Sequence, residues 1–156
     1  MKKKNIAIVL VMALSLLPLV KVQAHCEIPC GIYEDSLRYE LIKEHITTIE
    51  KSMKQINELS DADEENYHQI VRWVINKEEH AKKIQDIVSQ YFLHQRIKLT
   101  GAKDKAKYDK YVKELTLLHE LLVYSMKAKQ TSDLKYIDSL SKSLEAFASS
   151  YFKHDH

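Results

Sequence analysis

Apolar residues recur every three or four positions through most of the chain beyond residue 34. This spacing brings them to one face of an α-helix, so the pattern predicts amphipathic helices. Polar breaks divide the pattern into four segments, which we expect to be helices at about residues 35–59, 64–93, 105–129 and 134–151. Gly101 is the only glycine in this part of the chain, and no proline occurs beyond Pro29. Both facts favour continuous helices with short connections.

Each predicted helix has an apolar stripe, and three have candidate caps. Asp35 or Ser36 suits the start of the first helix, and the polar break at 60–63 suits the second. Ser132 or Asp133 suits the fourth. Four amphipathic helices joined by short loops predict an all-α, antiparallel four-helix bundle. The stripes comprise Leu37, Leu41, Ile42, Ile46, Ile49, Met53 and Ile56; Ile70, Val74, Ala81, Ile84, Val88 and Tyr91; Val112, Leu115, Leu118, Leu122, Val123 and Met126; and Leu134, Ile137, Leu140, Leu144, Phe147 and Tyr151.

The first 24 residues have the layout of a secretory signal peptide. Three lysines at positions 2–4 precede an apolar run at 6–20. Val22 and Ala24 then place small residues before a predicted cleavage site between Ala24 and His25. The apolar run is shorter than the roughly 20 residues of a membrane span. A retained N-terminal anchor is the alternative interpretation.

Cleavage would change the charge of the chain. The leader holds four lysines and no acidic residue, so the mature chain, residues 25–156, carries 20 basic and 22 acidic residues, a net charge of −2. Without a basic stripe, this composition gives no sign of nucleic-acid binding. We expect a single domain that is exported to the periplasm or outside the cell, with no membrane attachment once the leader is removed.

Residues 25–33, HCEIPCGIY, hold both cysteines of the chain directly after the predicted cleavage site. Cleavage would give His25 a free α-amine beside its imidazole, followed by the backbone nitrogen and thiolate of Cys26 and the thiolate of Cys30. Pro29 bends this segment, and Gly31 lets the backbone leave the turn. Nitrogen and thiolate donors in one plane suit Ni(II) or Cu(II), whereas zinc takes a tetrahedral site. We call this segment the hook.

The donor set of the hook suits one-electron redox chemistry. Thiolate and deprotonated amide donors lower the potential needed to reach a higher oxidation state, and an axial imidazole favours that state. A simpler interpretation is a disulfide between Cys26 and Cys30, which would close a loop too small to stabilise the fold much. The C-x3-C spacing differs from the C-x-x-C-H of haem attachment. The histidines of the predicted helices are scattered and do not supply the two Glu-x-x-His motifs of a di-iron bundle, so we expect neither a second metal site nor a di-iron centre in the bundle.

The hook resembles the N-terminal nickel hook of the nickel superoxide dismutases, whose pattern is H-C-x-x-P-C-x-x-Y. His25, Cys26, Pro29, Cys30 and Tyr33 all fall in register with it. A second similarity is SQYF, residues 89–92, which is similar to the family segment carrying a second active-site tyrosine. That tyrosine would be Tyr91. The resemblance implies a four-helix bundle that assembles as a homohexamer.

The resemblance also implies roles for these residues. His25 would bind nickel through its amine and imidazole, Cys26 through its backbone amide and thiolate, and Cys30 through its thiolate, with one nickel ion per subunit. Tyr33 and Tyr91 would line a small anion pocket, order water and restrict access. By Ni(III)/Ni(II) cycling, one superoxide would leave as O2, and a second would leave, with two protons, as H2O2.

Surrounding residues of the family site have counterparts here with weaker support. Glu27 stands in the hook where the family commonly has aspartate. Glu40, in the sequence RYE, is the counterpart of a glutamate that holds the axial imidazole. In the family this glutamate pairs with an arginine. Simple alignment places Asn76 at the position of that arginine, and the partner here would be Arg72, one helical turn away.

The leading hypothesis is therefore an exported nickel superoxide dismutase. An alternative is a non-enzymatic envelope protein that uses the same hook to bind nickel or copper for storage, sensing or delivery. A third is a structural bundle with a disulfide in place of the hook.

Overall fold

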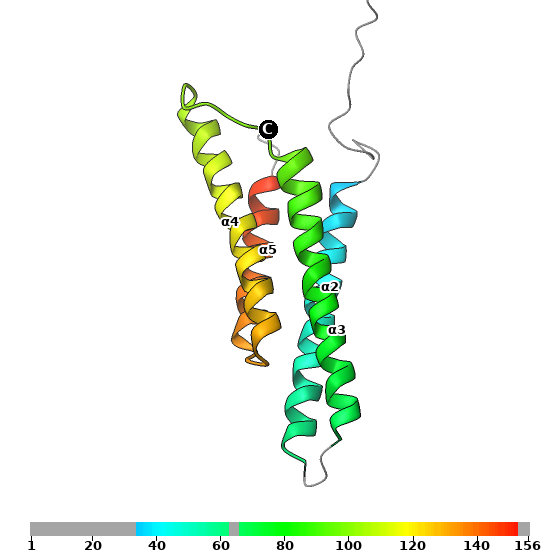
Figure 1. Ribbon diagram of the computed structural model, residues 1–156. Helices are drawn as coiled ribbons and strands as arrows, with labels where there is room; N and C mark the ends of the chain where they lie inside the picture. Colours follow the sequence, from blue (N-terminus) through cyan, green and yellow to red (C-terminus); the bar gives the residue numbers. More distant parts are fainter. Residues whose placement is uncertain (1–33, 63–65, 153–156) are drawn as a thin grey trace, which may run out of the picture.

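The computed structural model describes residues 34–62 and 66–152 (Figure 1). They form α2 (Asp35–Ser60), α3 (Tyr67–Asp86), α4 (Lys105–Gln130) and α5 (Lys135–Tyr151), and α3 continues directly into the π-helical segment η1 (Ile87–Arg96). No strand occurs in this part of the chain. α2 and α3 form one hairpin, α4 and α5 form the other, and the two hairpins pack together. The predicted all-α four-helix bundle is confirmed. The predicted leader and the hook lie outside the described residues.

The helix starts agree only in part with the predicted caps. Asn66 caps α3 by accepting a backbone N–H at 3.2 Å, so this cap lies beyond the break at 60–63. Asp133 accepts the first backbone N–H of α5 at 3.0 Å, close to the expected arrangement. The N-cap of α2 is Glu34, without a side-chain hydrogen bond. Neither Asp35 nor Ser36, the two predicted candidates, caps this helix, and the carboxylate of Asp35 bonds residues of other helices instead.

The end of the second helix differs from the prediction in both position and geometry. The predicted end was about Leu93, whereas η1 runs to Arg96 and closes with Ile97 N–H donating to Phe92 O at 2.9 Å. This i to i+5 bond defines a π-helix, a rare geometry that occurs often at functional sites. Residues five apart lie closer to one face in a π-helix than in an α-helix. Tyr91 and Arg96 can therefore reach the same partner.

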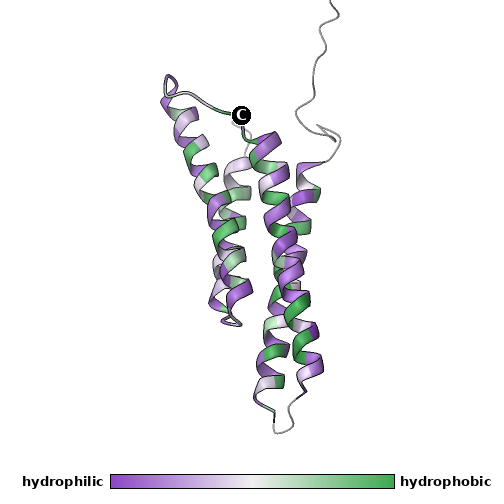
Figure 2. Ribbon diagram, viewed as in Figure 1, coloured by the Kyte–Doolittle hydropathy of each residue, from purple (hydrophilic) through white to green (hydrophobic). Residues whose placement is uncertain are grey.

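Aliphatic and aromatic side chains from every helix fill the core. Figure 2 shows apolar and polar residues alternating along the four helices. Phe92 and Phe147 are fully buried, and their rings meet edge to face with centroids 5.0 Å apart. The predicted stripe of α4 was wrong at Val112 and Met126, which are about 40% exposed. α4 carries leucine and valine on several faces, so its sequence fits more than one orientation. None of the described helices has the length and apolar character needed to cross a membrane.

A pair of histidines joins α2 to α3. The Nδ1 atoms of His45 and His80 lie 3.1 Å apart, and the rings are nearly perpendicular. One ring donates a hydrogen bond and the other accepts it. The accepting nitrogen has to be unprotonated, so the two imidazoles cannot both be positively charged in this arrangement. Burial lowers the pKa of His45, and the nearby charges of His80 and Lys83 lower it further. Burial and the charge of Lys83 also lower the pKa of His80, against the opposing effect of Glu44.

The histidine pair should make the bundle less stable in mild acid. Both pKa values lie below the ordinary 6.5 in the folded state. As the pH falls through 6.5, the unfolded chain therefore binds protons before the folded chain does, and the free energy of unfolding decreases. The loss is about 1.4 kcal/mol for each pKa unit by which folding lowers the pKa of a histidine. Urea unfolding at about pH 7.5 and pH 5 should show this loss. His80→Asn, which keeps a neutral hydrogen-bonding group, should reduce it. The exposed His119→Asn should not, and an equal effect of the two variants would contradict the assignment.

Candidate active site

The hook joins the bundle at one defined end. Tyr33, its last residue, directly precedes Glu34, where the described chain begins. At this end the start of α2 lies beside the ends of η1 and α5 (Figure 1). His25, Cys26, Glu27, Cys30 and Tyr33 lie outside the described residues, so their assigned roles stay predictions.

Asp35 is the centre of a hydrogen-bonded cluster at this end. Its Oδ1 accepts the hydroxyl of Tyr91 at 2.5 Å. Its Oδ2 accepts Arg96 Nη2 at 2.7 Å and the hydroxyl of Tyr151 at 2.8 Å. The side chain of Asp35 is only 18% exposed, and that of Arg96 is 32% exposed. One carboxylate therefore ties the first turn of α2 to η1 and to the last turn of α5.

The cluster fixes the protonation of its members. Burial tends to raise the pKa of Asp35, but hydrogen bonds from Arg96, Tyr91 and Tyr151 outweigh it and hold this pKa below its ordinary value. Burial and the hydrogen bond to Asp35 raise the pKa of Tyr91 to about 12, and the same two causes raise that of Tyr151 to about 12. Both phenols are thus protonated donors at neutral pH, and the carboxylate is an ionised acceptor.

Tyr91 is the predicted site residue that the structure places best. It is 5% exposed and packs edge to face against Phe92, with ring centroids 5.2 Å apart. The guanidinium carbons of Arg38 and Arg96 lie 5.2 and 5.7 Å from the centroid of its ring. Tyr91 was predicted both as a core residue and as a site residue. It is buried, and its hydroxyl reaches the residue two positions beyond the hook.

Glu40 and Arg72 do not come together within one chain. Both are exposed. The contacts of His45 with His80 and of Ser52 with Asn76 set the register of the α2–α3 hairpin. In this register Glu40 lies near the hook end, whereas Arg72 lies about 20 Å away along the helix axis. Arg38 and Arg96 are the arginines nearest Tyr91 that the described contacts show.

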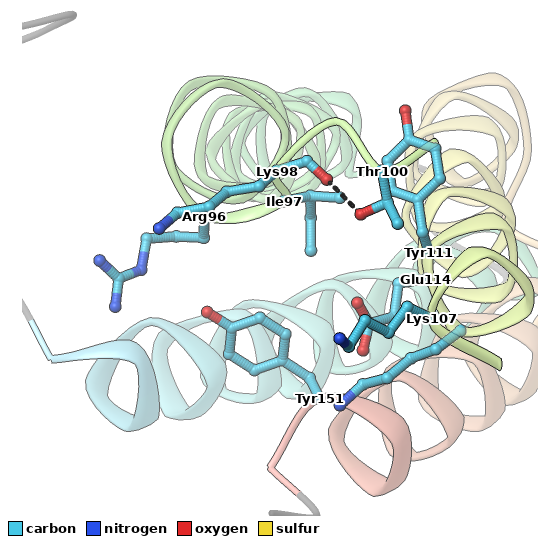
Figure 3. A pocket seen from close by; sticks show the side chains of 9 residues that line it. Arg96, Ile97, Lys98, Thr100, Lys107, Tyr111, Glu114 and Tyr151 are labelled. Atoms are coloured by element: carbon cyan, nitrogen blue, oxygen red, sulfur yellow. Dashed lines mark hydrogen bonds between the residues drawn. The ribbon is translucent and has the colours of Figure 1, made fainter. Parts of the chain in front are cut away.

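A pocket with a cationic lining lies beside the cluster. Its volume is about 240 Å³, and Arg96 and Tyr151 belong both to its wall and to the Asp35 cluster. Figure 3 shows the guanidinium of Arg96 extending away from Tyr111 and Glu114 on the other side of the pocket. Glu114 is buried and accepts Ser150 Oγ at 3.2 Å, and burial raises its pKa. The remaining lining residues are Ile97, Lys98, Thr100, Lys107 and Lys110.

The sequence did not indicate Asp35, Arg96 or Tyr151 as site residues. Asp35 looked like a helix cap, and Tyr151 looked like a core residue. Arg96 belongs to no recognised sequence motif. Within residues 34–62 and 66–152, no group of three or more histidine, cysteine, aspartate or glutamate side chains is arranged to hold a metal ion.

The described residues define a class: an all-α four-helix bundle with a buried cluster of Asp35, Tyr91 and Arg96 at the end that the predicted hook precedes. A sequence model of the family described as nickel-containing superoxide dismutase matches residues 20–155. The chain belongs to this family. It is accordingly an oxidoreductase with nickel as its cofactor and superoxide as its substrate. No curated protein and no solved structure gives a significant match.

Proposed function

We propose that this protein is an exported superoxide dismutase that works through Ni(III)/Ni(II) cycling at the hook. The leader would be removed between Ala24 and His25, in the periplasm or outside the cell. Removal would create the amine ligand, so export and assembly of the metal site would be linked. The observation that carries the proposal is the position of Tyr91, whose hydroxyl bonds Asp35 two residues beyond a nine-residue segment with the family pattern.

The donor set of the hook fits nickel. His25, Cys26 and Cys30 together offer an amine, an imidazole, a backbone amide and two thiolates, a mixture of nitrogen and soft sulfur donors. When bound there, nickel supplies one-electron exchange with superoxide. The protein has to admit two superoxide anions in turn, deliver two protons and limit competing ligands. Tyr33 and Tyr91 would restrict access and order water beside the hook.

Positive charge at the hook end supports the choice of an anionic substrate. Arg38 and Arg96 flank the ring of Tyr91, while Asp35 supplies a single negative charge to the cluster. The neighbouring pocket adds Lys98, Lys107 and Lys110, against one carboxyl group, that of Glu114. An excess of positive charge around a site raises the local concentration of an anionic substrate and its rate of association. The mature chain carries net negative charge, so this local excess is not a property of the whole surface.

Assembly as a homohexamer is part of the proposal. It comes from the resemblance, and α3 offers a surface that would suit it. Val71 and Ile75 lie four residues apart on one face of the helix and are 55% and 52% exposed. Neighbouring apolar side chains of this kind often mark an interface between subunits.

Native mass spectrometry of protein purified from the exporting cell should test the proposal in one experiment. We expect six subunits, each beginning at His25 and each carrying one nickel ion, and a preparation that dismutates superoxide. A chain that holds nickel or copper but does not turn over would favour storage, sensing or delivery. A chain two hydrogens light and free of metal would be the disulfide form, and the proposal would fail.

A further inference from the structure

The cationic pocket beside the Asp35 cluster has positive charges that the described part of the chain does not compensate. Lys107 pairs with Asp104 at 3.1 Å, whereas Lys98 and Lys110 form no ion pair with another described residue. Lys98 follows η1 and Lys110 belongs to α4, so the two side chains line the pocket from different elements. Two lysines that line one concave site are placed to attract the same anion.

A buried carboxyl group forms part of the wall of this pocket. Glu114 is 7% exposed, and Figure 3 shows its side chain extending from α4 into the pocket. Its Oε1 accepts Ser150 Oγ at 3.2 Å, and its Oε2 has no hydrogen bond to the described residues. Burial raises the pKa of this carboxyl group against the opposing effects of Lys110, Ser150 and Lys113. A carboxyl group of this kind binds a proton more readily than an exposed one, and in that form it donates a hydrogen bond to an anion.

The size of the pocket and its apolar surfaces indicate the class of ligand. Pockets for drug-sized molecules have volumes of about 300–1,000 Å³, and this one has a volume of about 240 Å³. It therefore suits a smaller molecule. Ile97 and the rings of Tyr111 and Tyr151 supply apolar surface for the carbon atoms of such a ligand. Inorganic phosphate has no carbon atoms to place against this surface.

We propose that this pocket binds a small organic dicarboxylate of about four to six carbon atoms. One carboxylate would pair with Lys98 and the other with Lys110, while Glu114 would donate a hydrogen bond. Two negative charges match the two uncompensated lysines, and charge-assisted hydrogen bonds are about twice as strong as neutral ones. The inference goes beyond the proposed function, because it concerns a second site that takes no part in the redox chemistry.

A solvated groove with ordinary surface lysines is the competing explanation. In that account any dianion would gather weakly near the positive charge, and removal of any exposed lysine would have the same small effect. A built site depends instead on which lysine is removed. Glu114 gives a further distinction, because glutamine at this position keeps the size of the side chain, removes the negative charge and offers an N–H donor.

Isothermal titration calorimetry of the mature, nickel-loaded protein with succinate would test the inference. The titration needs low ionic strength and a buffer without carboxylate or phosphate, because salt screens exposed charges. We expect saturable binding of one succinate per chain with a dissociation constant of about 1 mM or tighter. Succinamide, the neutral amide of the same length, should not bind, and inorganic phosphate should bind more weakly than succinate.

Single substitutions would locate the ligand. Lys110→Gln should weaken succinate binding by about tenfold, the effect of losing one charge-assisted hydrogen bond. Lys98→Gln, which lies outside the helices, should weaken it in the same direction. Lys142→Gln removes an exposed lysine of α5 that does not line the pocket, so it should leave binding unchanged. Glu114→Gln should strengthen binding. Circular dichroism would check that each variant is folded.

The outcomes separate this site from general charge attraction. Equal effects of Lys110→Gln and Lys142→Gln would overturn the inference, and so would wild-type protein that shows no saturable binding of succinate. Phosphate that binds as tightly as succinate would contradict the assignment to an organic ligand. The titration needs neither superoxide nor turnover, so failure of the proposed function and failure of this inference can be told apart.

Discussion

Replacing Cys30 by serine should abolish dismutation and leave the helical bundle folded. A serine hydroxyl stays protonated at neutral pH and cannot replace a thiolate as a ligand for nickel. Loss of groups that only support a ligand typically costs 10–100-fold in metal affinity or activity, so loss of the ligand itself should cost more than about 100-fold. Residue 30 precedes the first described helix, so thermal unfolding followed by circular dichroism should change little. Nickel content and superoxide turnover are the quantities to measure, and Cys26→Ser should behave in the same way.

The matched control removes a possible metal-binding side chain from the bundle. His119 is exposed on α4, and His119→Gln should keep both nickel and activity. If the cysteines form only a disulfide, Cys30→Ser would alter the mass of the protein, and its nickel content and superoxide turnover would not change. A Cys30→Ser protein that dismutates superoxide at the wild-type rate would remove this residue from the ligand set.

The helical architecture was predictable because short-range sequence patterns determine it. A repeat of three to four residues, polar breaks and scarce glycine are sufficient to place helices. Most of the predicted stripe of α5 is buried, with Leu140 and Phe147 inaccessible to solvent, whereas Leu134 at its start is 36% exposed. The prediction was weaker for α4, where leucine and valine occupy several faces and Val112 proves exposed. There the choice of buried face depends on neighbouring helices, which one segment of sequence does not contain.

The Asp35 cluster shows why much of the site could not be read from sequence. A carboxylate at a helix start is a common cap, so the local signal favoured that role for Asp35. Its actual partners lie on two other segments, η1 and α5, which the fold brings to it. The π-helical geometry of η1 adds to the difficulty, because it changes which residues share a face. Tyr91 was found through its similarity to a family segment, whereas Arg96 had no such signal.

The hook is the opposite case. Its chemistry follows from the types and order of its donors rather than from packing, so nine residues and a predicted cleavage site were enough to suggest nickel or copper, and the family resemblance then favoured nickel. The family match over residues 20–155 supports nickel as the cofactor independently of that argument. The body of the bundle then adds what the hook does not contain: a buried tyrosine of fixed protonation and positive charge near the point of attachment.

A single alanine added before His25 should remove activity as thoroughly as loss of a thiolate. In the proposed site the amine and the imidazole belong to the same residue, so both can bind one metal ion at once. An added alanine would convert that amine into an amide and carry the free amine one residue away. We expect nickel binding and turnover to fall by more than about 100-fold, with thermal unfolding unchanged. Mature chains with and without the alanine, released from the same fusion by a protease, would be compared by metal analysis and superoxide assay.

Two controls make this result specific to the amine. The same alanine added after His156 should have no effect, because only the N-terminus is proposed to bind metal. Removal of the added N-terminal alanine by an aminopeptidase should restore nickel binding and activity, which damage to the fold would not allow. An extended chain that keeps full activity would show that the amine is not a ligand. Cleavage between Ala24 and His25 would then be a step of export alone, with no part in making the metal site.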